Sequence, residues 1–420
     1  MQQRIVSNSR MTRPIVLVVL LFASAQAPSA QDWAQWRGPF RNAVVPAASV
    51  PASWPASFAE AWRVEVGEGY SSPVLAGGRL YVHSRVDPQE IVTAVDAASG
   101  AVIWQQRYDA AFTKNQYAVR MAKGPNATPL VSGSRVFTLG VTGLLTAWDA
   151  ARGAHLWRKD YTAQVDTSKL FCGTSASPLL AGGLLVVQVG SDVHGGRIAG
   201  LEPASGETKW EWKGPGPGYA SPMLIDVAGT PHIVTMTNSS VVGVDARNGS
   251  ELWSIAFPDD WHENIVTPVW TGTALIVSGV RQGTQAYRLA QVAGAWRATA
   301  LWKNADVTMY MSAPVFGDGV IYGLGSKRKG HFVALDAATG AVKWTTEGRE
   351  GDHASVLLSP AHVLFLTSTG DLVVANRNPD AFALVKKYDL ANSETWAVPI
   401  LLGREIVLRE AAHLVKLTGS

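Results

Sequence analysis

The sequence is poor in cysteine, and Cys172 is the only one among its 420 residues. A single thiol cannot form an intrachain disulfide, so the fold must be held together by its core instead. No cysteine lies directly after the first 27 residues, so we also expect no lipid anchor at the start of the mature chain. We interpret Cys172 as a small residue packed before a strand, with a reactive thiol as the alternative.

Charged residues are also scarce, at 16% of the chain against 47% for hydrophobic residues. The net charge of +3 equals the three arginines that lie, without any acid, among the first 27 residues. The rest of the chain is therefore close to neutral, and its charge gives no reason to expect a nucleic-acid partner. The basic cluster Lys327-Arg328-Lys329 is interpreted as solvated surface, with contact to an acidic partner as the alternative.

Long apolar runs are missing as well. The run at residues 15–22 is eight residues long, whereas a membrane-spanning helix needs about 20. It follows three arginines and precedes Ala25-Gln26-Ala27, an order typical of a cleavable export signal. We therefore expect a signal peptide over residues 1–27 and a periplasmic or secreted mature protein without a transmembrane segment. Residues 28–57 form an N-terminal extension that either caps the fold or stays extended.

Glycine, proline and tryptophan are abundant instead, at 40, 22 and 16 residues, and they recur in a fixed order. The motif Ser71-Ser72-Pro73-Val74-Leu75 opens a unit that repeats with a spacing of roughly 47 residues, within the range of propeller blades. The prolines of the copies are Pro73, Pro129, Pro178, Pro222, Pro268, Pro314 and Pro399. A degenerate copy, Ala354-Ser355-Val356-Leu357, fills the gap before the last one.

Each copy continues in the same way. A tight turn such as Ala76-Gly77-Gly78 leads to an apolar strand, and a variable loop leads to a third strand that ends in an acid. A short turn from that acid to a glycine, at residues 96–100 in the first copy, leads to a last strand that carries a tryptophan. The turn recurs at residues 149–153, 202–206, 245–249 and 336–340. An Asp that bonds the turn backbone and a left-handed Gly are typical of a short hairpin with a bulge. Each repeat therefore predicts a four-stranded blade.

The N-terminal strand predicts how the ring closes. The segment Ala59-Glu60-Ala61-Trp62-Arg63-Val64 resembles the last strand of a repeat but stands before the first proline strand, whereas the copy at Pro399 ends after three strands. Pairing these two segments leaves no incomplete blade. We therefore predict an all-β fold in which residues 58–420 form one eight-bladed β-propeller of four-stranded antiparallel blades, closed by an N-terminal outer strand.

The repeat resembles that of a known family. Residues 336–344, Asp-Ala-Ala-Thr-Gly-Ala-Val-Lys-Trp, are similar to the pyrroloquinoline quinone (PQQ) repeat. That repeat occurs in quinoprotein dehydrogenases and in the lipoprotein of the bacterial outer-membrane β-barrel assembly machinery. The resemblance covers nearly the whole mature chain, and residues 33–39, Trp-Ala-Gln-Trp-Arg-Gly-Pro, resemble the start of exported bacterial PQQ-like propellers of unassigned role. The motif is specific for the fold and unspecific for activity.

The repeated tryptophans have a structural and a functional interpretation. A ring at the same place in every blade can wedge between neighbouring blades, or it can stack on a bound molecule. We favour the wedge, because one such ring buries roughly 150–250 Å² and its burial stabilises the fold by several kcal/mol. The structural set is Trp62, Trp104, Trp157, Trp210, Trp253, Trp302 and Trp344.

The loops predict where a ligand would bind. In an up-and-down blade, the two short repetitive turns lie on one face, so the variable loops and the connections between blades lie on the other. Specificity is usually placed in such variable loops on a rigid frame. The residues just before each proline strand should then ring the mouth of the central channel. The candidate ligand-binding residues are Glu68, Tyr70, Lys123, Asn126, Tyr219, His262, Glu263, Asn264, Tyr310, Asp352, His353 and Trp396. A water-filled channel with ordinary solvated loops is the alternative.

These residues favour a non-catalytic scaffold that binds an envelope protein or a small ligand, with no cofactor and no metal. The alternative class is a quinoprotein oxidoreductase with PQQ and calcium. The family's calcium ligands are Glu, Asn and Asp, and Glu263, Asn264 and Asp352 are of those types. They do not form a recognisable family motif, and the adjacent cysteine pair of those enzymes is missing. His262 and His353 lack the close spacing of a metal site. A third possibility, an assembly factor for outer-membrane proteins, rests on fold analogy.

Overall fold

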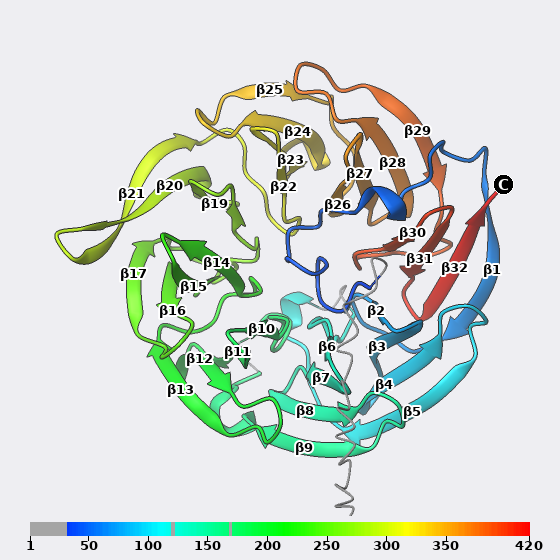
Figure 1. The fold of residues 1–420 in the computed structure, drawn as a ribbon, viewed down its shortest axis with the longest axis horizontal. Coiled ribbons are helices and arrows are strands. Elements are labelled where there is room, and N and C mark those ends of the chain that lie inside the picture. The colour runs from blue at the N-terminus through cyan, green and yellow to red at the C-terminus, as the bar shows by residue number, and fades with distance from the viewer. Residues whose placement is uncertain (1–31, 119–121, 168–169) are drawn as a thin grey trace, which may run out of the picture.

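The structure, a computed structural model, describes residues 32–118, 122–167 and 170–420. The predicted signal peptide lies outside these residues. Within them, the chain forms eight four-stranded antiparallel sheets arranged as the blades of a ring (Figure 1). Helix is limited to four short 3-10 turns, none long and apolar enough to cross a membrane: η1 (Ala47–Ser49), η2 (Gln116–Ala118), η3 (Thr162–Gln164) and η4 (Lys327–Lys329). The predicted eight-bladed propeller is confirmed.

Within each of the first four blades, consecutive strands are neighbours, running from the channel outward. Their bounds are β2 (Val74–Ala76), β3 (Arg79–Val86), β4 (Gln89–Asp96) and β5 (Val102–Asp109); β6 (Leu130–Ser132), β7 (Arg135–Leu139), β8 (Leu144–Asp149) and β9 (His155–Asp160); β10 (Leu179–Ala181), β11 (Leu184–Ser191), β12 (Gly195–Leu201) and β13 (Thr208–Gly214); β14 (Met223–Val227), β15 (Thr230–Met236), β16 (Ser240–Asp245) and β17 (Glu251–Ala256).

The last four blades follow the same plan, except that the eighth takes its outer strand from the N-terminal part of the chain. Their bounds are β18 (Val269–Trp270), β19 (Leu275–Gly279), β20 (Gly283–Val292) and β21 (Ala295–Asn304); β22 (Val315–Gly317), β23 (Val320–Gly325), β24 (His331–Asp336) and β25 (Val342–Thr345); β26 (Ala354–Leu358), β27 (His362–Thr367), β28 (Asp371–Asn376) and β29 (Leu384–Asp389); β30 (Ile400–Leu402), β31 (Glu405–Arg409), β32 (His413–Gly419) and β1 (Phe58–Glu65).

The ring closes through the two ends of the described chain. Strand β1 pairs antiparallel with β32, from Phe58 opposite Gly419 to Glu65 opposite His413. Figure 1 shows β1 as the outer edge of this blade, with the C-terminus beside it. The pairing supplies the fourth strand that the copy at Pro399 lacks, as the sequence predicts.

The acid-to-glycine turns have the predicted chemistry. In the first blade, the Asp96 carboxylate accepts hydrogen bonds from the backbone N–H groups of Ala98 and Ser99, and Gly100 has a φ of +77°. The pairing of β4 with β5 shifts register between Ala94 and Val95, which places a bulge beside the turn. Because these turns join the third strand to the fourth, they lie on the same face of the ring as the turns that join the first strand to the second. We call this face the turn face.

The repeat tryptophans contact the blade that follows their own. The Trp104 ring lies against Gly153, where a Cβ atom would come within 2.6 Å of the ring, and its Nε1–H donates to the Ala150 carbonyl at 3.1 Å. Five of the seven make this bond to the next blade: Trp104, Trp157, Trp210, Trp302 and Trp344.

The other two tryptophans depart from this arrangement. The Trp62 ring packs against Gly100 of the next blade, although its Nε1–H has no partner. Trp253 instead donates to His232 of its own blade. The following blade has a long β20–β21 hairpin without an acid-to-glycine turn, and its Trp296 packs edge-on against His232 at 4.4 Å.

A second set of contacts joins the blades around the channel. A hydroxyl precedes five of the seven repeat prolines and accepts a hydrogen bond from the backbone of the neighbouring blade, as in Ser72 N–H to Thr128 Oγ1 at 2.9 Å. The same bond links Thr128 to Ser177, Ser177 to Ser221, Ser221 to Thr267, and Val398 to Ser72. It is interrupted where the chain has Ala313 or Val398 before the proline instead of a hydroxyl residue. The Ser/Thr-Pro motif is therefore a belt of inter-blade hydrogen bonds.

Residues 32–57 cross the central opening of the ring (Figure 1). Trp33 bridges to Leu75 of the first blade, and Val44 bridges to Leu358 of the seventh. The Asp32 carboxylate accepts a bond from Gly77, and Gly403 donates to Ser49. These contacts lie at the ends of inner strands on the turn face, so the segment closes the channel there. Of the two alternatives for the N-terminal extension, its described part caps the ring.

Candidate functional site

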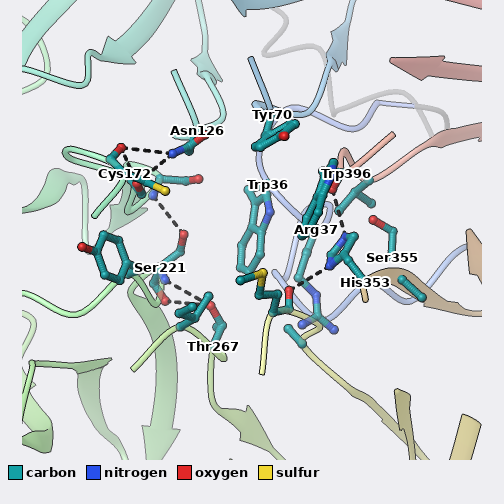
Figure 2. Close-up of a pocket in the computed structure, with 18 of the residues that line it drawn as sticks. Trp36, Arg37, Tyr70, Asn126, Cys172, Ser221, Thr267, His353, Ser355 and Trp396 are labelled. Atoms are coloured by element: carbon teal, nitrogen blue, oxygen red, sulfur yellow. Dashed lines mark hydrogen bonds between the residues drawn. The ribbon is translucent and has the colours of Figure 1, made fainter. Parts of the chain in front are cut away.

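The opposite end of the channel opens into a cavity of about 190 Å³. Residues that precede the inner strands form its walls, and Trp36 and Arg37 of the N-terminal segment also line it. Six of the predicted ligand-binding residues line the cavity: Tyr70, Asn126, Tyr219, Glu263, His353 and Trp396. Figure 2 shows Trp36 between two sides, with Cys172, Ser221 and Thr267 on one and Tyr70, Trp396 and His353 on the other. We call this site the mouth cavity.

One side of the mouth cavity is aromatic. The His353 and Trp396 rings stack with centroids 4.9 Å apart and an angle of 15° between their planes. Tyr70 also packs against Trp396, with its ring centroid 5.2 Å from that of the Trp396 ring. Flat rings in this arrangement offer a stacking surface to a planar ligand.

His353 is locked in place and neutral. Its Nδ1 lies 3.0 Å from the Met311 carbonyl oxygen, and its Nε2 lies 3.0 Å from the Trp396 carbonyl oxygen. Burial lowers the pKa of His353 to about 4, although both carbonyls favour the protonated ring. The imidazole is therefore uncharged at neutral pH, and its single N–H donates to one of these two carbonyls.

The phenol groups of the cavity are also committed to the backbone. The Tyr70 hydroxyl accepts a hydrogen bond from Ala122 N–H at 3.0 Å, and the Tyr219 hydroxyl accepts one from Phe171 N–H at 2.7 Å. Burial raises the pKa of Tyr70 to about 12 and raises that of Tyr219 further. Both side chains position loops at the mouth and remain protonated at neutral pH.

Glu263 is the acid in the cavity wall. Tyr310 donates its hydroxyl hydrogen to Glu263 Oε2. Burial raises the pKa of Glu263, and the bond from Tyr310 opposes this shift. The predicted residue Tyr310 thus acts on the cavity through Glu263.

Cys172 lines the same cavity, half-buried. Burial raises the pKa of its thiol to about 12. Since the thiolate is the nucleophilic form, a protonated thiol of this kind is poorly reactive. This environment fits the packing interpretation of Cys172.

The other predicted residues lie outside the mouth cavity. Exposed His262 places its Nδ1 2.5 Å from Asp192 Oδ2 and lines a smaller adjoining cavity of about 140 Å³. Glu68 pairs through its backbone with Arg85. Lys123 forms an ion pair with Asp87.

Asn264 and Asp352 are separated from Glu263 and from each other. The Asn264 side chain is buried, and its amide donates to the Thr237 and Phe257 carbonyls at 2.9 Å each. Asp352 is exposed and lines an open groove with Lys329 and Arg349. The oxygen ligands of the calcium hypothesis are therefore not brought together, and the described residues contain no group of three His, Cys, Asp or Glu side chains placed to hold a metal ion. The residues present do not fit a PQQ–calcium site of the type considered.

Sequence reasoning missed the two residues that the N-terminal segment contributes. Trp36 and Arg37 belong to the motif at residues 33–39. In the sequence, this motif supports only the family resemblance and does not predict where these residues lie in the fold. Arg37 is 3% exposed, and its Nη2–H donates to the Pro314 carbonyl at 2.5 Å. The motif does signal the site, because it places an arginine beside a tryptophan in a chain with few charges. The sequence gives no indication of which blades it contacts.

An eight-bladed ring built from this repeat defines a PQQ-like β-propeller. Residues 88–346 and 237–387 match the family model described as outer membrane protein assembly factor BamB. These matches span well over half of the chain. The chain therefore belongs to this family, which confirms the resemblance seen in the repeats.

A curated relative agrees with the family. BamB from Moranella endobia (strain PCIT) is 25% identical over 269 residues, which are 60% of this chain and 64% of the relative. The match thus spans slightly less than two thirds of the relative's length.

Solved structures of two kinds share the fold. BamB from Moraxella catarrhalis superposes with a TM-score of 0.60 at 14% identity, covering 86% of this chain and 99% of that one. The quinohemoprotein alcohol dehydrogenase from Comamonas testosteroni gives 0.67 at 14% identity, covering 92% and 80%. A europium-containing methanol dehydrogenase gives 0.65 at 12% identity, covering 92% and 91%. At these identities the likeness concerns the fold alone.

Proposed function

We propose that this chain is an exported, non-catalytic scaffold of the BamB-like family that binds an envelope partner through the mouth cavity. The observation that carries the proposal is the cavity itself. It is formed by residues from all eight blades and by Trp36 and Arg37 of the N-terminal segment, and six of the predicted residues line it. The family's description as an outer membrane protein assembly factor supports a partner in the bacterial envelope.

The chemistry of the cavity supports binding rather than catalysis. His353 is kept neutral by burial, and the hydroxyls of Tyr70 and Tyr219 accept hydrogen bonds from backbone N–H groups. The Cys172 thiol is kept protonated by burial. A general base or nucleophile needs a pKa near the working pH and a free position toward the substrate. These four groups instead serve to fix the shape of the cavity.

Filling the cavity tests the proposal. Cys172→Phe adds a ring at the wall, whereas Cys172→Ser keeps the original size and serves as the matched control. Both variants and the wild type would be immobilised and exposed to envelope extract, with melting temperatures measured to confirm folding. We expect the wild type and Cys172→Ser to retain the same specific partner and Cys172→Phe to lose it. Equal retention by a folded Cys172→Phe variant would refute a role for the cavity.

A quinoprotein oxidoreductase is the second candidate, supported by the fold shared with the quinohemoprotein alcohol dehydrogenase. The separation of Glu263, Asn264 and Asp352 counts against it. Titration with PQQ and calcium distinguishes the two candidates. A bound quinone absorbance band and reduction of an artificial electron acceptor would favour the oxidoreductase. A flat titration would favour the scaffold.

A further inference from the structure

Arg37 differs from the other buried arginines of the described chain. Four are buried, and one of them, Arg85, places its Nε 2.5 Å from Asp87 Oδ1. Arg41 reaches three carbonyls, those of Ser177, Pro178 and Pro222, and Arg409 reaches those of Gly67, Ser71 and His83. Arg37 has one, that of Pro314; its guanidinium carbon lies 5.6 Å from the centroid of the Trp36 ring, and its buried Nη1 has no hydrogen-bond partner. Of the three that lack a carboxylate, Arg37 is the one that lines the mouth cavity.

A buried cation of this kind needs a counter-charge. Moving a charge out of water is costly unless it is paired and hydrogen-bonded. Burial lowers the pKa of Arg37 to about 9, so the side chain remains cationic at neutral pH. An anion in the cavity would supply the missing partner, and a carboxylate matches the planar donors of a guanidinium.

A second unpaired group lies in the same wall. The Nε1–H of Trp396 is buried without an acceptor, although the Trp396 ring itself is held by stacking on His353. Indole N–H groups that are buried usually have a partner. The Trp396 Nε1–H and Arg37 Nη1 are thus two buried donors without a hydrogen-bond partner on residues that line the cavity.

The size and walls of the cavity limit the body of the ligand. Its volume of about 190 Å³ is only slightly larger than an apolar cavity of about 150 Å³ that holds benzene. Trp36 and Tyr70 supply aromatic surfaces on which a flat ring can stack. A single aromatic ring fits this space.

We propose that the mouth cavity binds a small aromatic carboxylate, with its carboxylate group toward Arg37 and its ring against the aromatic wall. This inference rests on the proposed function, because it assigns a ligand class to the same cavity. Glu263, the acid in the wall, is hydrogen-bonded by Tyr310, and its charge favours placing the anionic end of the ligand on the Arg37 side. His353 is neutral and adds no competing charge.

Three single-ring probes test the inference: benzoate, its neutral counterpart benzamide, and the cation benzylamine. Binding to the full mature chain would be followed by tryptophan fluorescence, since Trp36 and Trp396 line the site, and by calorimetry. We expect benzoate to bind at least tenfold more tightly than benzamide, and benzylamine to bind most weakly. Equal affinities for benzoate and benzamide, or no binding of any probe, would overturn the inference.

Arg37→Met and Arg37→Lys show whether the arginine is responsible. The methionine variant should lose the preference for benzoate over benzamide, and the lysine variant should keep part of it. Replacing an unpaired buried charge by an apolar side chain of similar volume is often neutral or stabilising, so Arg37→Met should melt no lower than the wild type. A folded Arg37→Met variant that still prefers benzoate would refute the assignment. If no probe binds while Cys172→Phe still loses its envelope partner, the inference fails and the proposed function stands.

Discussion

The two faces of the ring are built from different kinds of sequence. On the turn face, one acid-to-glycine turn recurs with the same hydrogen bonds, as at Asp96 and Asp336. At the mouth, every blade contributes a different side chain, and the segment that forms the cavity's base belongs to no repeat. The propeller scaffold is therefore encoded by a motif that recurs from blade to blade, whereas each feature of the mouth cavity is encoded at a single position in the sequence.

This difference has an energetic consequence. A contact repeated around the ring contributes to the stability of the whole fold, so its loss should be visible in unfolding experiments. A contact at the mouth fixes a single loop or side chain, so its loss should affect binding more than stability. The following variants test this division, from the largest expected effect to the smallest.

Removing a fully enclosed tryptophan should have the largest effect. Trp253 is 4% exposed and packs against Gly243 of its own blade. We expect Trp253→Ala to lower the free energy of unfolding by roughly 3–5 kcal/mol, because it removes a large buried ring and leaves a cavity. Trp62 is only partly buried and makes no hydrogen bond. Trp62→Ala should therefore cost about half as much in denaturant unfolding. An unchanged unfolding curve for Trp253→Ala would show that this ring does not stabilise the propeller.

Two glycines of the turn face separate backbone strain from packing. Gly153 has a φ of +70°, and a Cβ there would lie 2.6 Å from the Trp104 ring. Gly77 has a φ of +56° with nothing within 4 Å of the same position. Gly77→Ala should cost about 1 kcal/mol from the left-handed backbone alone. Gly153→Ala should cost roughly 2–4 kcal/mol, because overpacking adds to the strain. Equal losses in the two variants would show that the tryptophan contact is loose.

The fold could be predicted almost completely because its signals are periodic. The prolines set the blade spacing, the acid-to-glycine turns set the hairpins, and Trp62 showed which blade was incomplete. The exceptions lie where the period fails, as in the β20–β21 hairpin, whose tip has Ala293 and Gly294 in place of the repeated turn.

The site could be predicted only in part, for a physical reason. The rule that residues before the inner strands ring the channel pointed to the region where Tyr70, His353 and Trp396 line the cavity. It could not show that Asn264 turns inward to bond two carbonyls. Nor could it place Arg37, since the path of a non-repeating segment across the ring depends on contacts with distant blades.

His353 allows a pH test of the mouth. The pKa of its buried ring, about 4, lies below the value of roughly 6.5 expected for an unfolded chain. Its contribution to stability is therefore complete above about pH 6.5 and is lost as the pH falls toward 4, because the unfolded chain then binds a proton that the folded chain does not. We expect a loss of roughly 1–3 kcal/mol over this range, and His353→Gln should flatten it. The exposed His262→Gln serves as the control. If His353→Gln followed the wild-type pH profile, the ring would not be held neutral.

The belt of inter-blade hydrogen bonds around the channel allows a test with a smaller expected effect on stability. Thr128→Val keeps the shape of the side chain but removes the acceptor for Ser72 N–H. A buried N–H without a partner costs about 1–3 kcal/mol, and we expect the lower end because one link of several is lost. Thermal unfolding measures this effect. A variant as stable as the wild type would show that the belt accompanies blade packing without strengthening it.

The complementary change, Ala313→Ser, should have the smallest effect and the opposite sign. Ala313 occupies one of the places in the belt where the hydroxyl is missing, and it also lines the mouth cavity. A serine there can accept the backbone N–H of Thr267, as Thr267 itself accepts that of Ser221. We expect a gain of at most about 1 kcal/mol in the free energy of unfolding. A gain in stability without a change in benzoate affinity would show that residue 313 affects the stability of the fold. Weaker benzoate binding at unchanged stability would show that it affects the binding site instead.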